Sequence, residues 1–415
     1  MPTSNSELIK ILLVLGPFVG MNPDLLAKKL NEISVKMDDH WKLFAITSHP
    51  ISQVSSSCTL EFHIVRLLGS PKSLASRVFY LLGCIRRGVG LVKKEDIQVI
   101  TQHDGHLEYG IVAYVISKLT HRKCLIRINE DTLIPFIFFL KDSQNFLFRS
   151  KTILWIIAFG YRSLERSFLK RVDWIITHGP MDYQEIKKIN NRITFVPLWV
   201  DTKKFRRLDE EYVQRSKKEL AISKDMRILL FVGRLHPEKG VVTLLRALKT
   251  LKDKRLTLLL VYSFSEYKRE YQNLAEQLGI SDQVRFIGYI PNDDMPKYYN
   301  LADLYILPSL REEWSNTIME AMACRTPVIA SDTGSNPYLV MEKKTGFLVH
   351  PNDSNGLAQQ IRFVLDHPDA SKCVTEAAAC EITQYDKNTI GDAYKTVVIS
   401  LAKSQKEAKS MMTQV

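Results

Sequence analysis

The chain has 415 residues, which is long for a single hydrophobic core and predicts two domains. Hydrophobic residues make up 45% and charged residues 25%, as in ordinary globular proteins, and no apolar run reaches the ~20 residues that a membrane-spanning helix needs. The net charge of +12 lies mostly in residues 1–200, where 26 basic and 17 acidic side chains predict an anionic partner. No nucleic-acid-binding motif accompanies this charge, so a membrane surface or an acidic glycan is the expected partner; a merely solvated basic surface is the alternative.

The start of the chain and the cysteines bear on the compartment. The first residues lack a basic region, and the apolar run of residues 11–15 is too short for a signal peptide. The six cysteines are scattered and no two have the spacing of metal ligands. We therefore expect a cytoplasmic protein with reduced thiols.

The first apolar run, residues 10–15, is followed by a glycine loop at residues 16–20 and then by leucines at helical spacing. This order is typical of the first strand and helix of a Rossmann-like domain. Gly16 and Gly20 would let the backbone approach a ligand closely, although a plain tight turn explains them equally well. The loop is not a GxGxxG sequence, so a dinucleotide is not implied. Further strands, mostly separated by helical stretches, are predicted at residues 42–46, 97–101, 124–128 and 173–177.

Polar residues follow three of these strands. Open parallel sheets bind ligands at the carboxyl ends of their strands, and His103 lies there directly after the strand at residues 97–101. Arg127 and Asn129 end the next strand, and His178 follows the strand at residues 173–177. A lone histidine at a strand end is more often structural than functional, so His103 is only a candidate.

Residues 146–171 show one long helical pattern interrupted by Gly160. Arg162, Arg166 and Lys170 recur every four residues and form a basic stripe. A basic amphipathic helix can lie on an anionic membrane. The alternative is a helix that packs on the sheet and exposes a solvated face.

A polar connection at residues 197–226 precedes a second Rossmann-like unit. Its strand at residues 227–232 leads into a loop with Arg234 and Lys239, and a helix follows at residues 241–251. Two cations beside a helix N-terminus suit a diphosphate, although the GK[ST] ending of a Walker A loop is absent. The remaining elements are expected as strands at residues 256–261, 284–287 and 345–349, helices at 293–300, 354–365 and 386–402, and a polar, frayed tail at 403–415.

Residues 303–340 contain the clearest candidate site. A strand at residues 304–307 is followed by a polar loop, a helix at residues 316–323 with Ser315 as its N-cap, and a strand at residues 327–330. Glu312 in the loop and Glu320 in the helix offer carboxylates to sugar hydroxyls. The free N–H groups expected at the helix start would hold phosphate; they belong to Ser315, Asn316, Thr317 and Ile318. The set suits a sugar nucleotide.

The segments FVGRLHPEKG, VRFIGYIPNDDMPKYYNLADLYILPS and EEWSNTIMEAMACRTPVIASDTG occur in this order within residues 231–334. They resemble the retaining glycosyltransferases of family four, which have the GT-B fold of two Rossmann-like domains facing a central cleft. The resemblance is strong over residues 227–350 and weak in the first half. The chain departs from the family pattern at Glu313, where glycine is usual, and near Tyr338, where an acidic residue is usual.

The resemblance implies a role for each candidate residue. Arg234 and Lys239 would hold the donor diphosphate, Glu320 the ribose hydroxyls, and Glu312 the donor sugar. The loop containing Gly16 and Gly20 would close over the diphosphate, and His103 would contact the transferred sugar. The backbone of the helix start, from Ser315 to Ile318, would contact sugar and phosphate. No metal or other cofactor is expected, because the two cations and the helix end supply the electrostatic stabilisation.

The sequence therefore predicts an α/β protein of the GT-B type. Residues 1–200 would bind the acceptor, 201–385 the nucleotide-sugar donor, and 386–415 would form a helix that crosses back to the first domain and a tail. The expected function is retaining sugar transfer to a glycan or lipid-linked acceptor, in the cytoplasm and docked peripherally on a membrane. A nucleotide-sugar epimerase and a non-catalytic binding subunit of the same fold remain alternatives; a phosphorylase of this fold would be much longer.

Overall fold

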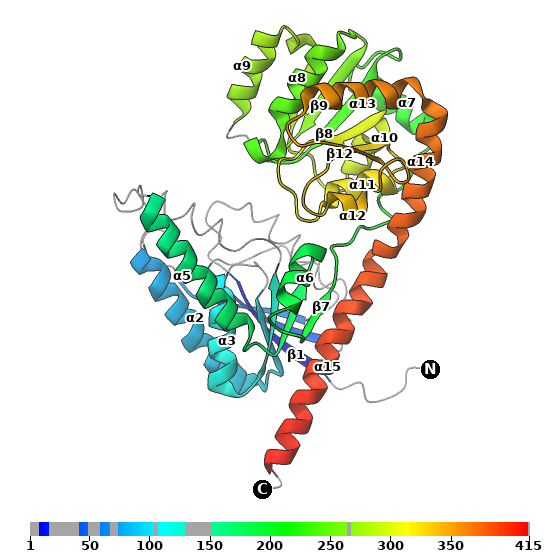
Figure 1. Cartoon of the computed structure of the whole chain (residues 1–415). Helices are drawn as coiled ribbons and strands as arrows, with labels where there is room; N and C mark the ends of the chain where they lie inside the picture. Colours follow the sequence, from blue (N-terminus) through cyan, green and yellow to red (C-terminus); the bar gives the residue numbers. More distant parts are fainter. Residues whose placement is uncertain are drawn as a thin grey trace, which may run out of the picture. The chain divides into compact units, whose positions relative to one another are not determined.

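The computed structural model describes residues 8–15, 41–48, 59–66, 74–102, 107–128, 151–263 and 267–413. The chain divides into two compact units. Unit 1 comprises residues 1–196 and 391–415, and unit 2 comprises residues 197–390. Each unit is built on one sheet of parallel strands flanked by helices (Figure 1), which is the Rossmann-like arrangement expected from the alternation of apolar runs and helical patterns.

Unit 1 contains a seven-stranded sheet in the order β3-β2-β1-β4-β5-β6-β7. The strands are β1 (Ile9–Val14), β2 (Trp41–Thr47), β3 (Thr59–Ile64), β4 (Val99–Gln102), β5 (Lys123–Ile128), β6 (Trp174–Thr177) and β7 (Ile193–Phe195). The inner strands are largely buried, as expected for parallel strands made of continuous apolar runs. The five strands predicted for this half are confirmed, whereas the edge strands β3 and β7 were not predicted.

One face of this sheet carries helices α2 (Leu74–Glu95), α3 (Leu107–Thr120) and α5 (Lys151–Leu169), and α6 (Pro180–Lys187) precedes β7. Helix α2 packs on α3, where Gly88 of α2 faces Ile116 of α3. The rings of Tyr114 on α3 and Phe168 on α5 pack edge to face, with their centroids 5.6 Å apart. The helix predicted at residues 146–171 is confirmed over Lys151–Leu169 as α5, and Gly160 does not interrupt it, while residues 146–150 lie outside the described residues. The helix predicted after the Gly16–Gly20 loop lies outside the described residues.

The last helix, α15 (Lys387–Thr413), begins in unit 2 and belongs to unit 1 from residue 391. Tyr394 packs under the guanidinium of Arg127, whose carbon lies 5.5 Å from the ring centroid. The prediction of a frayed tail from residue 403 is wrong, because the helix continues to Thr413. Gln405 is buried and its amide donates to the carbonyl of His121 at 2.9 Å, so a tertiary contact stabilises a segment that has few apolar residues.

Unit 2 contains a six-stranded sheet in the order β10-β9-β8-β11-β12-β13. The strands are β8 (Arg227–Val232), β9 (Leu256–Val261), β10 (Val284–Gly288), β11 (Leu304–Leu307), β12 (Val328–Ser331) and β13 (Phe347–Val349). The helices are α7 (Glu210–Glu219), α8 (Val241–Leu251), α9 (Lys268–Leu278), α10 (Met295–Leu301), α11 (Asn316–Ala323), α12 (Asn336–Leu339), α13 (Ser354–Asp366) and α14 (Pro368–Glu381). Within the described ranges, no helix combines the length and apolar content required to cross a membrane.

Candidate functional site

The candidate site of unit 2 begins where the loops after β8 and β11 meet. These two strands are parallel neighbours, so their carboxyl ends lie at the same edge of the sheet. The N–H of Leu310 in the second loop donates to the carbonyl of Glu238 in the first at 2.7 Å. Gly240 has φ of +69°, and a Cβ there would lie 1.8 Å from the Pro308 carbonyl oxygen. The close approach of the two loops therefore requires glycine at this position.

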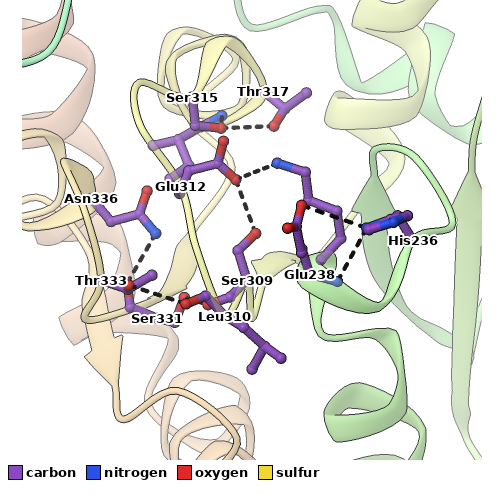
Figure 2. Close-up of polar contacts among 12 residues, drawn as sticks. His236, Glu238, Ser309, Leu310, Glu312, Ser315, Thr317, Ser331, Thr333 and Asn336 are labelled. Carbon is purple, nitrogen blue, oxygen red and sulfur yellow. Dashed lines mark hydrogen bonds and ion pairs between the residues drawn. The ribbon is translucent and has the colours of Figure 1, made fainter. Parts of the chain in front are cut away.

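Glu312 belongs to the loop after β11, and its side chain is bonded to the loop after β8 (Figure 2). Its Oε2 atom accepts hydrogen bonds from Lys239 Nζ at 2.8 Å and from Ser309 Oγ at 2.9 Å. The side chains of Lys239 and Glu312 are only 18% and 11% exposed, so each charge is compensated mainly by the other. The sequence placed both residues at the site but could not show that they form an ion pair, because they lie 73 positions apart.

The turn after β12 packs against the backbone of the same loop. Ser331 Oγ donates to the Ser309 carbonyl, and the N–H of Ser335 donates to the Glu312 carbonyl at 3.3 Å. Gly334 has φ of +56°, and a Cβ there would lie 1.6 Å from the Glu312 carbonyl oxygen. The position of Glu312 is therefore fixed by backbone contacts from two neighbouring strand ends as well as by its ion pair.

The start of α11 lies beside Glu312 (Figure 2) and has the predicted N-cap. Ser315 Oγ accepts a hydrogen bond from the N–H of Ile318 at 3.3 Å. The expectation of a free N–H at Ile318 is therefore wrong, because the cap uses that group. The N–H groups of Asn316 and Thr317 have no acceptor within the described part of the chain, and the Asn316 side chain is exposed. An anion at the start of α11 could therefore be bound by these two N–H groups and by the positive end of the helix dipole.

Glu320 lies one turn further along α11 and is bonded to a buried tyrosine. Tyr299 OH donates to Glu320 Oε2 at 2.7 Å. Burial raises the pKa of Tyr299, and the nearby Glu320 carboxylate raises it further, so the phenol remains protonated and donates its hydrogen. Sequence reasoning missed Tyr299 on α10 and Ser309 in the loop after β11, since a single hydroxyl gives no signal until its partner is known.

Arg234 lies in the same loop as Lys239 but is exposed. Its side chain has no ion pair or hydrogen bond to another described residue. His236 follows, with Nδ1 accepting from the N–H of Glu238 at 3.4 Å and its ring edge-on to Tyr267. Arg234 is thus available to an anionic ligand, whereas the Lys239 ammonium is shared with Glu312. Glu313, which stands where the family usually has glycine, has its Oε1 atom 3.4 Å from Nη2 of Arg311.

The candidates of unit 1 are only partly described. Gly16, Gly20, His103 and Asn129 lie outside the described residues. At the carboxyl ends of β4, β5 and β6, Gln102 donates to the Arg127 carbonyl at 2.6 Å, and the Arg127 guanidinium lies 3.0 Å from His178 Nε2. His178 is buried, and its other ring nitrogen contacts the Val196 carbonyl at 2.5 Å, so both nitrogens have structural partners. Among the described residues, no group of three or more His, Cys, Asp or Glu side chains could hold a metal ion.

The sequence of unit 2 matches a known family. Residues 213–380 match the family model described as glycosyl transferases group 1. This part of the chain is a glycosyl transferases group 1 domain. It contains every described site residue named above for unit 2, and the resemblance drawn from the sequence motifs is confirmed over this range.

Two curated relatives of this chain are glycosyltransferases by name. The D-inositol 3-phosphate glycosyltransferase of Corynebacterium jeikeium is 32% identical over 219 residues, which are 49% of this chain and 52% of that protein. The protein of the same name from Streptomyces avermitilis is 32% identical over 198 residues, or 45% of this chain and 42% of the other. The chain therefore matches about half the length of these relatives.

Solved structures resemble the chain over nearly its full length. The sucrose-phosphate synthase of Thermosynechococcus elongatus aligns with a TM-score of 0.75 and 20% identity, covering 95% of this chain and 100% of the other. The Anabaena protein HepE, solved in complex with UDP and glucose, aligns with a TM-score of 0.74 and 18% identity, covering 94% and 100%. At such identities the likeness concerns the fold, and it confirms the prediction of a GT-B fold with two Rossmann-like domains.

Proposed function

We propose that this chain is a glycosyltransferase that moves a sugar from a nucleotide-sugar donor to a glycan or lipid-linked acceptor. The observation that supports this most directly is the arrangement around Glu312. The Lys239 ammonium, the Glu312 carboxylate and the first turn of α11 meet at one sheet edge of a group 1 domain. Cations and helix N–H groups attract a diphosphate, and carboxylates accept hydrogen bonds from sugar hydroxyls.

The roles proposed for individual residues follow from this chemistry. Arg234 and Lys239 neutralise the charge that develops on the leaving diphosphate, which is the usual task of preorganised cations at such a site. Glu320 binds the ribose and Glu312 the donor sugar. From unit 1, His103 contacts the transferred sugar, and the loop with Gly16 and Gly20 closes over the diphosphate.

We propose that the reaction needs no metal and retains the anomeric configuration. Arg234, Lys239 and the N–H groups of Asn316 and Thr317 supply positive charge where a metal ion would otherwise act. Two of the solved structures in the comparison support a uridine nucleotide as the donor class, because HepE was solved with UDP and with UDP-glucose.

Thermal unfolding with nucleoside diphosphates tests donor binding. A nucleotide present at a hundred times its dissociation constant adds about 2.7 kcal/mol of stability. For a domain of this size that corresponds to a rise in Tm of roughly 5 to 10 °C. Arg234→Ala should reduce the rise for UDP, whereas Lys249→Ala, which removes an exposed cation at the other end of α8, should not. If no nucleoside diphosphate raises the Tm, donor binding at this site is refuted.

We further propose that the enzyme is cytoplasmic and docks on an anionic membrane through unit 1. Arg166 in α5 and Lys170 directly after it are exposed. Arg162 Nη1 lies 2.8 Å from Glu165 Oε2, so its charge is locally compensated. Each basic residue near an anionic surface contributes about 1 kcal/mol of binding. The triple change of Arg162, Arg166 and Lys170 to Glu should reduce sedimentation with anionic vesicles. Unchanged sedimentation would show that the stripe is only a solvated helix face.

A further inference from the structure

Helix α2 exposes large apolar side chains that do not contribute to the hydrophobic core of unit 1. Its inner side is buried in the core of unit 1 through Tyr80 and Cys84, among others. On the opposite side, Val78, Phe79 and Leu82 are 46%, 63% and 56% exposed. Their positions at i, i+1 and i+4 place them on one side of the N-terminal half of the helix. Three large apolar side chains in one exposed cluster are characteristic of a binding surface.

The same side of α2 becomes basic toward its C-terminus. Arg86 lies seven residues after Phe79, and Lys93 lies seven residues after Arg86. Seven residues are nearly two helical turns, so these three side chains form a line along the helix at intervals of about 10 Å. Both Arg86 and Lys93 are exposed, and neither has an ion pair or hydrogen bond to another described residue. This side of α2 therefore has an apolar N-terminal end and a basic C-terminal end, whose two charges have no partner among the described residues.

We propose that this face of α2, formed by Val78, Phe79, Leu82, Arg86 and Lys93, is a docking surface for an anionic lipid bilayer. The apolar end inserts among the acyl chains, to a depth of about 5 to 10 Å for helices of this kind, while the basic end contacts the headgroups. Charge complementarity selects this occupant, because the excess of basic side chains in residues 1–200 adds to the same attraction. The cluster is far smaller than the roughly 20 to 30 residues that each partner contributes to a stable protein interface.

The neighbouring helices make such docking geometrically reasonable. Helix α3 packs against α2 and also contacts α5 through the Tyr114 and Phe168 rings, so α2 and α5 lie in one helical layer on the same face of the sheet. Helix α5 exposes Phe159 and Leu164 close in sequence to Arg166. The inference deepens the membrane part of the proposed function, and its test requires no sugar transfer.

The full chain is sedimented with vesicles of phosphatidylcholine alone or with 30% phosphatidylglycerol, a composition chosen about as anionic as cytoplasmic leaflets. Binding should require the anionic lipid. The variant Val78→Ser/Phe79→Ser/Leu82→Ser should bind at least about tenfold more weakly and lose the binding that persists at high salt. The variant Arg86→Glu/Lys93→Glu should lose roughly fivefold or more per residue at low salt. The controls are Met181→Ser on α6 and Arg246→Glu/Lys249→Glu on α8, which change exposed residues elsewhere and should bind as the wild type.

Insertion is measured separately by adding a tryptophan. The added fluorescence of Phe79→Trp should be quenched by lipids brominated on their acyl chains, and that of Met181→Trp should not. Equal sedimentation of the α2 variants and the wild type, or absence of quenching at residue 79, overturns the inference. If the α2 variants bind normally while the α5 triple variant does not, membrane docking through α5 stands and the role of α2 is refuted. Loss of nucleotide binding in unit 2 would leave these results unaffected.

Discussion

Replacing Lys239 by methionine removes the ammonium group that contacts the Glu312 carboxylate. Exposed ion pairs contribute about 0 to 1 kcal/mol, whereas removing one partner of a buried pair costs about 3 to 5 kcal/mol. The two side chains are 18% and 11% exposed, so the free energy of unfolding of unit 2 should fall by about 2 to 3 kcal/mol. For a domain of this size, that lowers the Tm by roughly 5 to 10 °C.

The cause of this loss is tested by a double-mutant cycle with Glu312→Gln. If Lys239→Met destabilises by leaving a carboxylate uncompensated, neutralising that carboxylate should recover about 1 to 2 kcal/mol. Ser309→Ala serves as the control, because it removes a hydrogen bond to the same Oε2 atom without changing the charge. Urea unfolding of the wild type, the single variants and the double variant gives the coupling energy. A coupling below about 0.5 kcal/mol would refute the conclusion that the pair acts as a unit.

The same variants separate stability from catalysis. Lys239→Met should lower the rate of sugar transfer on the order of 100- to 1000-fold, because a cation is lost from the leaving diphosphate. Glu312→Gln should restore stability in the double variant without restoring this rate. Near-normal transfer by Lys239→Met would contradict the role proposed for its ammonium group.

Three further predictions concern other parts of the account. Glu320→Gln should weaken the binding of UDP measured by calorimetry, while Glu312→Gln should chiefly lower turnover; equal losses of UDP affinity would contradict the separate roles. Sugar transfer should persist in excess EDTA, and a loss that magnesium or manganese restores would refute the metal-free mechanism. Gly240→Ala should lower the free energy of unfolding measured in urea by more than about 2 kcal/mol, since its Cβ would meet the Pro308 carbonyl. Gly160→Ala, at an open and exposed helix position, should instead raise it by about 0.5 to 1 kcal/mol. Similar free energies of unfolding for the two variants would argue against the contact between Gly240 and Pro308.

The sequence predicted those elements whose signal is local. Strands β8 and β9 and helices α8 and α11 have the predicted limits, because the strands are continuous apolar runs, Gly233 follows β8, Gly240 precedes α8 and Ser315 provides the N-cap of α11. Strand β3 was missed because it is an edge strand, and Glu61 and His63 interrupt its apolar pattern. The end of α15 was missed because a bond between Gln405 and His121, 284 positions apart, stabilises it. Composition alone gives no sign of such a contact.

The candidate site was predictable in its residue types but not in its connections. Glu312, Glu320, Arg234 and Lys239 were recognised from motifs at strand ends, where the chain order of the elements already determines proximity. The partners of these groups could not be read from the sequence, since Ser309 is one of several polar residues in a loop and Tyr299 is one of several tyrosines on predicted helices. Helix α2 was not singled out because exposure, which distinguishes Phe79 from Tyr80 beside it, depends on the packing of α3.

The stereochemistry of the product tests the central claim most directly. The enzyme is incubated with UDP-glucose and candidate acceptors, and the anomeric proton of the new glycoside is followed by NMR spectroscopy together with the release of UDP. We expect UDP release, a glycoside with the anomeric configuration of the donor, and a rate that falls on the order of 100-fold or more in Lys239→Met. A product of inverted configuration would contradict the retaining mechanism. Release of a free sugar derivative in the absence of any acceptor, at a rate that acceptors do not change, would contradict sugar transfer and indicate an epimerase.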